Sequence, residues 1–453
     1  MKTYLTRRDF LRGAALVSIS AAIPRFGSVA RAQDAPVKRW YKGNLHMHNQ
    51  WSDGEVFPEQ AVAWYKDRGW DFICPSDHND FQSLDLRFTS FGSRPQMTDE
   101  MVAAFEGETS LWKPIKCDAV SNKLEQKFVD DAIAQLGSEN VKIKEVGGMT
   151  FVRMTPFDEL VEKFVEPDKF LMIPGYEHTG SCVDGRAVHM NFIGVRDHFG
   201  YNKKIEEPID QLRETFAKGK ERFGDVPYLF TANHPLWRFY DVNPSALMGN
   251  PAIRVFELIN NGIHKDFQRR MDLWEPEKFW DVVNAWRATN DQPLLLGMGS
   301  DDRHVYTGDS KGWTKVRASK LEWTELLTAI NEGDMYPSNG LDFEDVSFDG
   351  KTLAVKIDVK DDGRYKIDFV GTKKGYDPTC KIVQVEKSET TPERKVEAYS
   401  DEIGVVLESV EGTEASYTLK SDDLYVRAKI YRADDDPALK WKTKPAAWTQ
   451  PWR

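Results

Sequence analysis

The stretch GNLHMHNQWSDGE, residues 43–55, places two histidines one residue apart at the end of an apolar run, with an aspartate five residues later. The whole chain has only nine histidines in 453 residues. Side chains at positions i and i+2 of a strand point the same way, so His46 and His48 should share one face of a strand that runs into a loop at Asn49. Two imidazoles so placed predict a metal site, although an HxH pair alone fits two unrelated polar histidines equally well.

Other histidines and acids stand at the ends of further apolar runs, which favours one shared metal centre. In a parallel barrel all strand ends meet at one rim, so residues far apart in sequence converge there. Clustered imidazoles and carboxylates need a neutralising cation, and oxygen and nitrogen ligands without thiolates suit zinc, manganese or iron alike. The runs concerned are FICPSDH ending at His78, LMIPGYE ending at Glu177, VHMNFIG containing His189, YLFTANH ending at His234, and LLLGMGSDDRH containing Asp301, Asp302 and His304.

Short apolar runs alternate with amphipathic stretches over residues 37–340, the pattern of strand and helix units around a parallel sheet or barrel. A long insertion, residues 80–169, interrupts this pattern with a helix at 122–136 and a short strand pair around Gly147-Gly148. Loops of this length on a barrel are commonly lids or substrate walls. The expected strands are 72–75, 170–175, 188–194, 228–232, 253–259 and 294–298, and the expected helices are 58–68, 206–223, 277–289 and 321–331.

After Gly340 the hydrophobic period changes to two, which predicts a small β-sandwich-like domain over residues 341–453. Its expected strands are 353–359, 365–370 and 424–433. In the last of these Val426, Ala428 and Ile430 fall on one face with Leu424, and alternate residues such as Tyr425 and Arg427 fall on the other, as in a half-buried antiparallel strand.

Residues 1–32 are typical of an export signal and are set aside from the fold. Arg7 and Arg8 lie in TRRDFLR, which closely resembles the bacterial twin-arginine signal, and a short apolar segment and Ala30-Arg31-Ala32, a small-x-small cleavage site, follow. An amphipathic helix or membrane anchor is the alternative. We expect the twin-arginine export machinery as a partner, a periplasmic or secreted location, and no membrane anchor after cleavage.

The remaining composition narrows the class of protein. The formal net charge is −11, and would be −16 without residues 1–32, with acids and bases interspersed, so no nucleic acid partner is expected. The four cysteines, Cys74, Cys117, Cys182 and Cys380, form no CxxC pair, so neither a disulfide framework nor a thiolate zinc site is indicated.

Seven motifs together resemble the polymerase-and-histidinol-phosphatase (PHP) superfamily of metal-dependent hydrolases, over about residues 40–340. They are HMHNQWSDG, PSDHND, YEHT, the histidine of VHMNFIG, NHP, GSDDRH and GDMYPSNG; the SDDRH motif, with AAWTQPW near the C-terminus, looks most like the CehA/McbA-like branch. The resemblance implies a distorted (β/α)7 barrel, an α/β fold, with two or three divalent metal ions at its rim.

Position by position, the resemblance implies three metal sites. One ion would be held by His46, His48, Glu177 and Asp302, with Glu177 bridging to a second ion held by His189 and His234, and a third ion would take Asp53, His78 and His304. The family's acid-x-His ending reads here as SDDRH, so Asp301 competes with Asp302 for the ligand role, and Asp53 stands where some relatives have histidine.

Four further residues have open roles. His178 should point to the opposite face from Glu177, so it is either structural or a proton donor to the leaving group. Arg303 and Arg186 could each clamp an anionic substrate, since a guanidinium suits phosphate or carboxylate oxygens, although a surface ion pair is an equal alternative for Arg186. Asp301 is the fourth, as a catalytic candidate. His198 and His264 are expected at the surface or in loops, and Trp51, Trp237, Phe239, Tyr240 and Tyr306 either wall the pocket or fill core.

The expected function is metal-dependent hydrolysis of a small-molecule ester. Clustered cations make a bound water reactive at neutral pH and polarise the bond that breaks. A phosphodiesterase or phosphatase is the first expectation, and a carboxyl- or carbamate-ester hydrolase is the second. A non-catalytic periplasmic binding protein, or a lyase or deacetylase acting on cell-wall sugars, are further alternatives.

Overall fold

A computed structural model describes residues 37–79, 97–118, 120, 123–199, 204–224, 227–260, 275–310, 312–389, 392–433 and 445–453. The chain divides into one unit of residues Met1–Val37 and a second of residues Lys38–Arg453, and the second contains all the described helices and strands. The expected export signal and His264 lie outside the described residues. Within the described residues, no helix has the length and apolarity that a bilayer crossing requires.

The four helices expected at 58–68, 206–223, 277–289 and 321–331 are present, with ends shifted by one or two residues. Pro58, Pro208 and Pro276 each occupy the first turn of a helix, where proline is favoured because its missing N–H would have no partner there. Gly333, in the left-handed conformation with φ 83°, ends the helix before it. The helices are α1 (Pro58–Lys66), α2 (Asp99–Ala104), α3 (Gln126–Leu136), α4 (Phe157–Phe164), α5 (Pro208–Phe223), α6 (Pro244–Met248), α8 (Pro276–Thr289) and α9 (Trp323–Glu332), with 3-10 turns at Thr109–Leu111 and Ser138–Asn140.

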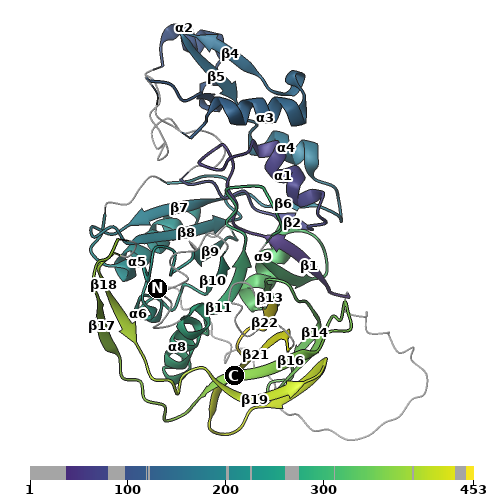
Figure 1. Cartoon of the computed structure of the whole chain (residues 1–453), viewed down its shortest axis with the longest axis vertical. Coiled ribbons are helices and arrows are strands. Elements are labelled where there is room, and N and C mark those ends of the chain that lie inside the picture. The colour runs from purple at the N-terminus through teal and green to yellow at the C-terminus, as the bar shows by residue number, and fades with distance from the viewer. Residues whose placement is uncertain are drawn as a thin grey trace, which may run out of the picture. The chain divides into compact units, whose positions relative to one another are not determined.

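The strands before residue 340 include all six that the sequence predicts, although several are shorter than expected (Figure 1). The expected strand 72–75 has only two residues in β-ladder geometry. These strands are β1 (Arg39–Asn44), β2 (Phe72–Ile73), β3 (Trp112–Pro114), β4 (Ile143–Val146), β5 (Met149–Arg153), β6 (Leu171–Met172), β7 (Gly175–Ser181), β8 (Ala187–Ile193), β9 (Leu229–Ala232), β10 (Val255–Asn260), β11 (Leu296–Ser300), β12 (Trp313–Ala318) and β13 (Met335–Ser338).

Two sheets carry the site, and both are mixed rather than wholly parallel. A five-stranded sheet has the order β11-β10-β9-β8-β7, and β1, β2 and β6 lie at one end of a nine-stranded sheet. Pairs β1–β2, β2–β6, β9–β10 and β10–β11 are parallel, as expected. Pairs β7–β8 and β8–β9 are antiparallel, which corrects the expectation of a parallel arrangement throughout.

The two sheets approach each other where their strands end. Parallel bridges join Met47 to Arg303 and His78 to Glu177, each linking a residue beyond a strand of one sheet to the other sheet. The fold is thus a mixed α/β arrangement whose sheets meet at these bridges. A closed (β/α)7 barrel stays a prediction.

The strands after residue 340 add to the same nine-stranded sheet, whose order is β19-β16-β21-β22-β13-β12-β1-β2-β6. The predicted boundary at 341 therefore falls between strands and not at a break in this sheet, and an independent C-terminal domain stays a prediction. These strands are β14 (Phe343–Phe348), β15 (Thr352–Ile357), β16 (Tyr365–Lys373), β17 (Lys381–Val385), β18 (Arg394–Ala398), β19 (Val405–Glu411), β20 (Glu414–Thr418), β21 (Asp423–Arg432) and β22 (Ala446–Trp448).

Both faces of β21 are buried, which corrects the half-buried strand that the sequence predicts. Val426 and Ile430 pack in an apolar cluster on one face, as expected. On the other face Arg427, only 1% exposed, donates to Asp281 of α8 at 2.9 and 2.6 Å. The period-two pattern shows alternation but not that a helix covers the second face.

The insertion forms a small sheet of its own in the order β3-β5-β4. The predicted strand pair is confirmed: β4 and β5 pair antiparallel through a turn at Gly147 and Gly148, with φ 58° and 73°. The helix there begins at Gln126, because Glu125 is its extended N-cap residue; position 122, the expected start, lies outside the described residues.

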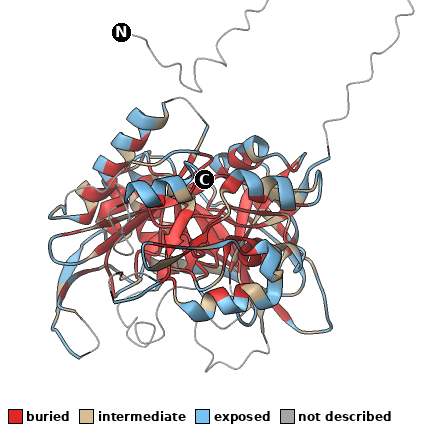
Figure 2. Cartoon of the chain, turned by 90° about the horizontal axis from the view of Figure 1, so that it is seen from above, coloured by how far each residue is buried: buried red, intermediate tan, exposed pale blue. Residues whose placement is uncertain are grey.

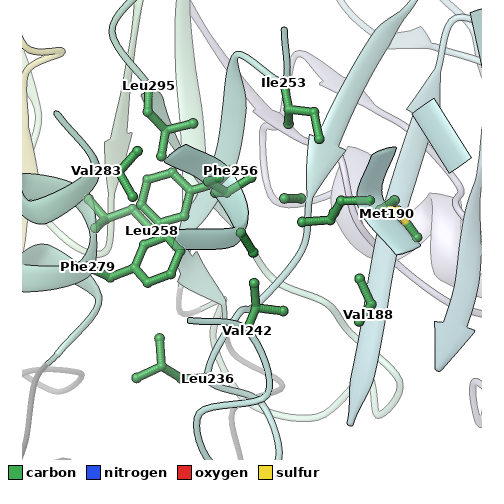
Figure 3. Packing of buried hydrophobic residues seen from close by; sticks show 14 of the residues in the cluster. Val188, Met190, Leu236, Val242, Ile253, Phe256, Leu258, Phe279, Val283 and Leu295 are labelled. Atoms are coloured by element: carbon green, nitrogen blue, oxygen red, sulfur yellow. The ribbon is translucent and has the colours of Figure 1, made fainter. Parts of the chain in front are cut away.

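The largest apolar cluster lies beneath the five-stranded sheet. Phe256 and Leu258 of β10 contact Phe279 and Val283 of α8 (Figure 3). Buried residues fill the centre of the structure, while exposed residues lie on helices and outer strands (Figure 2). This rigid base fixes the strand ends at which the polar residues stand.

Candidate metal centre

The first two predicted ligands lie just beyond β1 on one face of extended backbone. The nitrogen of His48 donates to Arg303 O at 2.9 Å, which ties this segment to the residues after β11. His46 Nε2 and His48 Nε2 are 3.1 Å apart, and both side chains are fully buried. The same-face geometry predicted from the HxH spacing is therefore present.

The antiparallel direction of β8 explains how His189 joins the group. His189 lies near the start of β8, whereas Glu177 lies within β7 and most of the other ligands follow strands. The antiparallel direction of β8 brings His189 to the same end as these residues. In the observed register Thr179 of β7 pairs with His189, two residues beyond Glu177. His189 Nδ1 lies 3.3 Å from Glu177 Oε1.

All nine predicted ligands gather in one place. They form four overlapping groups, in each of which the ligand atoms lie within 4.8 Å of one another. Two groups broadly match the expected ion sites, whereas His189 and His234, which were expected on one ion, fall in different groups. His46, His48, His78 and Glu177 are each shared between two groups. The groups are His46, His48 and Asp302; His46, Glu177 and His234; His78, Glu177 and His189; and His48, Asp53, His78 and His304.

Glu177 stands at the middle of the arrangement. Its Oε1 lies 3.3 Å from His46 Nε2 and 3.4 Å from His234 Nε2, while its Oε2 lies 2.6 Å from His78 Nδ1. The two oxygens thus face different histidines, but His46 and His234, which were expected on different ions, lie near the same oxygen. The predicted bridging role of Glu177 stays a prediction. Asn233 Nδ2 donates to Oε1 at 2.8 Å and holds the carboxylate in this orientation.

Burial and neighbouring charges divide the histidines into two kinds. Burial and the nearby imidazoles of His304 and His78 together lower the pKa of His48 to about 3. Burial also lowers the pKa of His189 to about 4, against the attraction of Glu177. For His304 burial acts in the same direction, but the carboxylates of Asp53 and Asp302 outweigh it and raise the pKa to about 9. A metal would find some imidazoles neutral and would displace protons from others.

The carboxylates are held in the charged form. Burial by itself would raise the pKa of Glu177, but the imidazoles of His78, His46 and His189 outweigh it and bring the pKa well below the usual range. The pKa of Asp302 is likewise lowered, because His46, His48 and His304 outweigh burial.

Two observations show that the site fits divalent metal ions. Glu177 Oε2 and Asp302 Oδ1 are buried and receive no hydrogen bond, and His78 Nδ1, the nitrogen nearest to Glu177 Oε2, hydrogen bonds with Thr179 Oγ1. Unpartnered buried carboxylate oxygens are costly unless a cation compensates them. The donor set of imidazoles and carboxylates without thiolate suits zinc, manganese or iron.

The side chains of the adjacent residues Asp301 and Asp302 have different surroundings. Asp302 Oδ1 lies 3.1 Å from His48 Nε2 and 3.3 Å from His46 Nε2. The side chain of Asp301 instead accepts hydrogen bonds from Arg303 Nε at 2.7 Å and from Tyr65 OH at 3.2 Å. Asp301 belongs to none of the four groups, so its predicted catalytic role is corrected to a structural one.

The predicted role of Arg303 as a clamp for an anionic substrate is also corrected. Its guanidinium donates to Asp301 and to the carbonyl oxygens of Val305, Thr307 and Asp309, and its Cζ lies 4.0 Å from the centre of the Trp64 ring. The residue is 3% exposed. The side chain organises the 303–309 loop with four of its five N–H groups and is almost completely buried, so it does not present a free guanidinium to a substrate.

Two residues have the non-catalytic alternatives that the sequence left open: an ion pair for Arg186 and a structural position for His178. Arg186 forms ion pairs with Asp184 at 2.7 Å and Glu207 at 3.0 Å. His178 lies on the opposite face of β7 from Glu177, fully buried, with its ring 5.0 Å from Phe199 and neither nitrogen hydrogen bonded. Burial lowers its pKa to about 3, which favours the neutral ring.

One important residue was missed by the sequence analysis. Glu257 of β10, 1% exposed, contacts His46 Nδ1 at 2.7 Å and accepts from the backbone nitrogen of His234 at 3.0 Å. Ser300 and Asn260 also donate to it, at 2.5 and 2.7 Å. A carboxylate that orients a ligating imidazole in this way tunes its basicity. The available signal was an acid inside the apolar run VFELIN.

Asp77, which precedes His78 in the PSDH motif, holds the loop that follows His48. It accepts from Asn49 through both the backbone nitrogen and Nδ2, at 2.9 and 2.7 Å. It also accepts from Ser52 Oγ at 2.8 Å. These bonds shape the loop between His48 and Asp53.

The aromatic residues near the motifs divide between core and site. Phe239 and Tyr240 belong to the large apolar cluster, and Trp51 packs into the core of the insertion. Tyr306 OH donates to His48 O at 2.8 Å. Trp237 lies against the site, with its ring centre 5.1 Å from that of His189. His198 lies 6.0 Å from Tyr176 and takes no part in the four groups.

Comparisons with known proteins yield no family assignment. No protein-family model matches the chain, and no curated protein matches it. A two-domain protein from Bacteroides vulgatus ATCC 8482, described as containing a predicted PHP-like metal-dependent phosphoesterase, is 16% identical with a TM-score of 0.37, covering 88% of this chain and 100% of that one.

Two further solved structures are more distant. A putative metal-dependent phosphoesterase from Bifidobacterium adolescentis ATCC 15703 is 12% identical with a TM-score of 0.29, covering 59% of this chain and 89% of that one. An amidohydrolase from Chromobacterium violaceum is 11% identical with a TM-score of 0.25, covering 58% and 87%. At such low TM-scores, the chemistry of the site has to be derived from its own residues.

Proposed function

We propose that this chain is a metal-dependent hydrolase, and most concretely a phosphoesterase acting on small-molecule esters. The observation that carries the proposal is the gathering of nine imidazole and carboxylate side chains into four overlapping groups around Glu177. A structural ion needs one closed set of ligands, whereas overlapping sets that share ligands suit two or three neighbouring ions with open positions.

The residues of the site have distinct tasks in such a reaction. When bound, two or more divalent ions supply a hydroxide at neutral pH and polarise the ester oxygen. Glu177 keeps its two oxygens directed at different histidines, and Glu257 fixes the orientation of the His46 ring. Asp53 and His304, with side chains 14% and 33% exposed, form an edge of the cluster that solvent reaches.

The proposed biological setting follows the motifs. The TRRDFLR segment supports export by the twin-arginine machinery to the periplasm or cell exterior, with residues 1–32 removed. The acidic composition supports a small-molecule substrate rather than nucleic acid. PHP superfamily membership and its CehA/McbA-like branch rest on the resemblance of the seven motifs.

One experiment tests metal dependence and reaction class together. The purified protein, loaded with zinc, manganese or iron, is assayed with bis(p-nitrophenyl) phosphate, p-nitrophenyl phosphate, p-nitrophenyl acetate and an aryl carbamate, and its metal content is measured by elemental analysis. His48→Ala and Glu177→Gln should lose metal and activity by more than the roughly 10- to 100-fold typical of outer-shell changes. His198→Ala, outside the four groups, is the matched control.

The outcomes separate the candidate functions. Fastest turnover of a phosphoester supports the phosphoesterase, whereas fastest turnover of the acetate or carbamate would assign the carboxyl- or carbamate-ester alternative. Bound metal without turnover of any ester would indicate a binding protein. Wild-type metal content and activity in both site variants would refute the metal centre itself.

A further inference from the structure

A tryptophan and an arginine at the edge of the metal centre have no role in the proposal so far. Trp237 and Arg238 follow His234 in the loop after β9. The Trp237 ring centre lies 5.1 Å from that of His189 and 5.4 Å from that of His234. Arg238 Cζ lies 4.5 Å from the centre of the Trp237 ring. Trp237 is half-buried and Arg238 is exposed, so the pair links the centre to solvent.

The guanidinium of Arg238 differs from those of the two arginines that the sequence singled out. Arg303 and Arg186 are neutralised by acids of the protein. The side chain of Arg238 lies over the Trp237 ring, and its charge acts against the rise that burial causes in the pKa of Asp241. The backbone nitrogen of Arg238 donates to Asp241 Oδ2 at 2.7 Å. The neighbouring carboxylate of Asp241 already accepts from Arg394 at 3.1 Å.

The loop that carries the pair is held in an unusual shape. His234, Phe239 and Tyr240 have φ values of 22°, 103° and 47°, a region that residues other than glycine seldom adopt. Such strain persists where surrounding contacts enforce it, and it is concentrated at ligand sites. Asp241 supplies those contacts, because it also accepts from the backbone nitrogen of Ala187 at the start of β8.

We infer that Trp237 and Arg238 are the substrate-recognition pair of the metal centre, an inference that rests on the proposed phosphoesterase function. The guanidinium binds an anionic oxygen of the phosphoester, and the indole contacts the apolar part of the ester. A guanidinium fork suits phosphate oxygens, and stacking on the ring keeps it oriented. A neutral carboxyl or carbamate ester has no anionic oxygen, so the pair selects phosphoesters over neutral esters.

Two substrates with the same leaving group test this selection. Bis(p-nitrophenyl) phosphate is anionic and p-nitrophenyl acetate is neutral, and both release p-nitrophenolate. With the metal-loaded enzyme, Arg238→Ala should lower kcat/KM for the phosphodiester by roughly 10- to 100-fold, the range of a hydrogen bond between charged groups. The rate with the acetate and the metal content should not change, and Arg238→Lys should restore part of the loss.

Binding of inorganic phosphate supplies a readout that is independent of turnover. Titration calorimetry of the metal-loaded protein should show weaker phosphate binding in Arg238→Ala, by a factor similar to the loss in kcat/KM. Arg213→Ala is the control, since Arg213 is an exposed arginine on α5 that pairs with Asp210.

The outcomes distinguish failure of the Arg238 inference from failure of the phosphoesterase proposal. Equal losses for both substrates, or unchanged phosphate affinity, would overturn the inference and leave the phosphoesterase standing. Turnover of the acetate alone in wild type, with phosphate affinity lost in Arg238→Ala, would overturn the phosphoesterase and support anion recognition by Arg238.

Discussion

At the scale of single residues, Glu177 and Asp302 direct their carboxylates at the clustered imidazoles, whereas the neighbouring Asp301 supports the fold. Glu177 places one oxygen near His46, His189 and His234 and the other near His48 and His78. Two adjacent aspartates leave the same strand end, yet one side chain lies among imidazoles and the other holds Arg303.

The two aspartates predict opposite phenotypes. Asp302→Asn removes a charge that lies 3.1 Å from His48 and should abolish metal binding. Asp301→Asn should keep the metal but lower the free energy of unfolding by about 3–5 kcal/mol, because the buried guanidinium of Arg303 loses its charged partner. Elemental analysis and urea unfolding measure the two effects. Loss of metal in Asp301→Asn with retention in Asp302→Asn would contradict this assignment.

The sequence predicted which residues gather but not where every side chain points. The i,i+2 spacing and the strand-end positions were sufficient for His46, His48 and Asp302. They could not reveal that Arg303 is used by the backbone of its own loop, because that depends on a fold that brings Val305 and Thr307 to it. Glu257 was missed because an acid inside an apolar strand has no spacing signature.

At the scale of elements, the hairpin β17–β18 reaches back to the loop that carries His234. Arg394 of β18 donates to Asp241 at 3.1 Å and to Phe239 O at 3.3 Å, and Glu397 accepts from Ser245 N of α6 at 3.0 Å. Figure 1 shows this hairpin beside α6. A segment more than 150 residues away in sequence therefore fixes the shape of the 234–241 loop.

Loss of this anchor should weaken metal binding. Arg394→Ala leaves the strained loop without its clamp, so affinity for Co²⁺ in competition titrations should fall by about 10-fold, as for other outer-shell changes. Arg394→Lys should recover part of the affinity. Lys395→Ala changes an exposed neighbour on the same strand and should bind metal as wild type does. Equal affinity in Arg394→Ala and Lys395→Ala would show that the hairpin has no such role.

The directions of the strands were only partly predictable. Alternating apolar runs indicated strands at the right places, and β9, β10 and β11 are parallel as expected. The short connection between β7 and β8 permits an antiparallel hairpin, whereas a parallel pair needs a crossover of a dozen residues or more. Residues 182–186 are too few for that crossover, a constraint that was available in the sequence.

At the scale of the whole molecule, one sheet joins the site to the C-terminal strands. β1, which leads into His46, pairs with β12, and β12 is connected through β13 and β22 to β21. The other face of β21 is bound to α8 by Arg427 and Asp281, which are 1% and 2% exposed. Burial lowers the pKa of Arg427, but Asp281 outweighs it and raises the pKa above the ordinary value. The C-terminal strands thus stabilise the sheet that carries the centre.

This buried pair predicts a large effect on stability. Asp281→Ala leaves the Arg427 guanidinium buried without its partner and should lower the free energy of unfolding by about 3–5 kcal/mol. Asp210→Ala breaks an exposed pair with Arg213 and should change it by no more than about 1 kcal/mol. Urea unfolding of both variants is the measurement. Similar small changes in both would mean that α8 and β21 are not coupled through this pair.

The most direct test of the metal centre is a crystal structure of the metal-loaded protein with anomalous diffraction recorded at the metal absorption edge. The arrangement of the nine side chains predicts at least two anomalous peaks a few ångströms apart, both within bonding distance of Glu177 and its neighbouring histidines. Absence of any peak among His46, His48, Glu177, His234 and Asp302, with metal bound elsewhere or nowhere, would contradict the central claim.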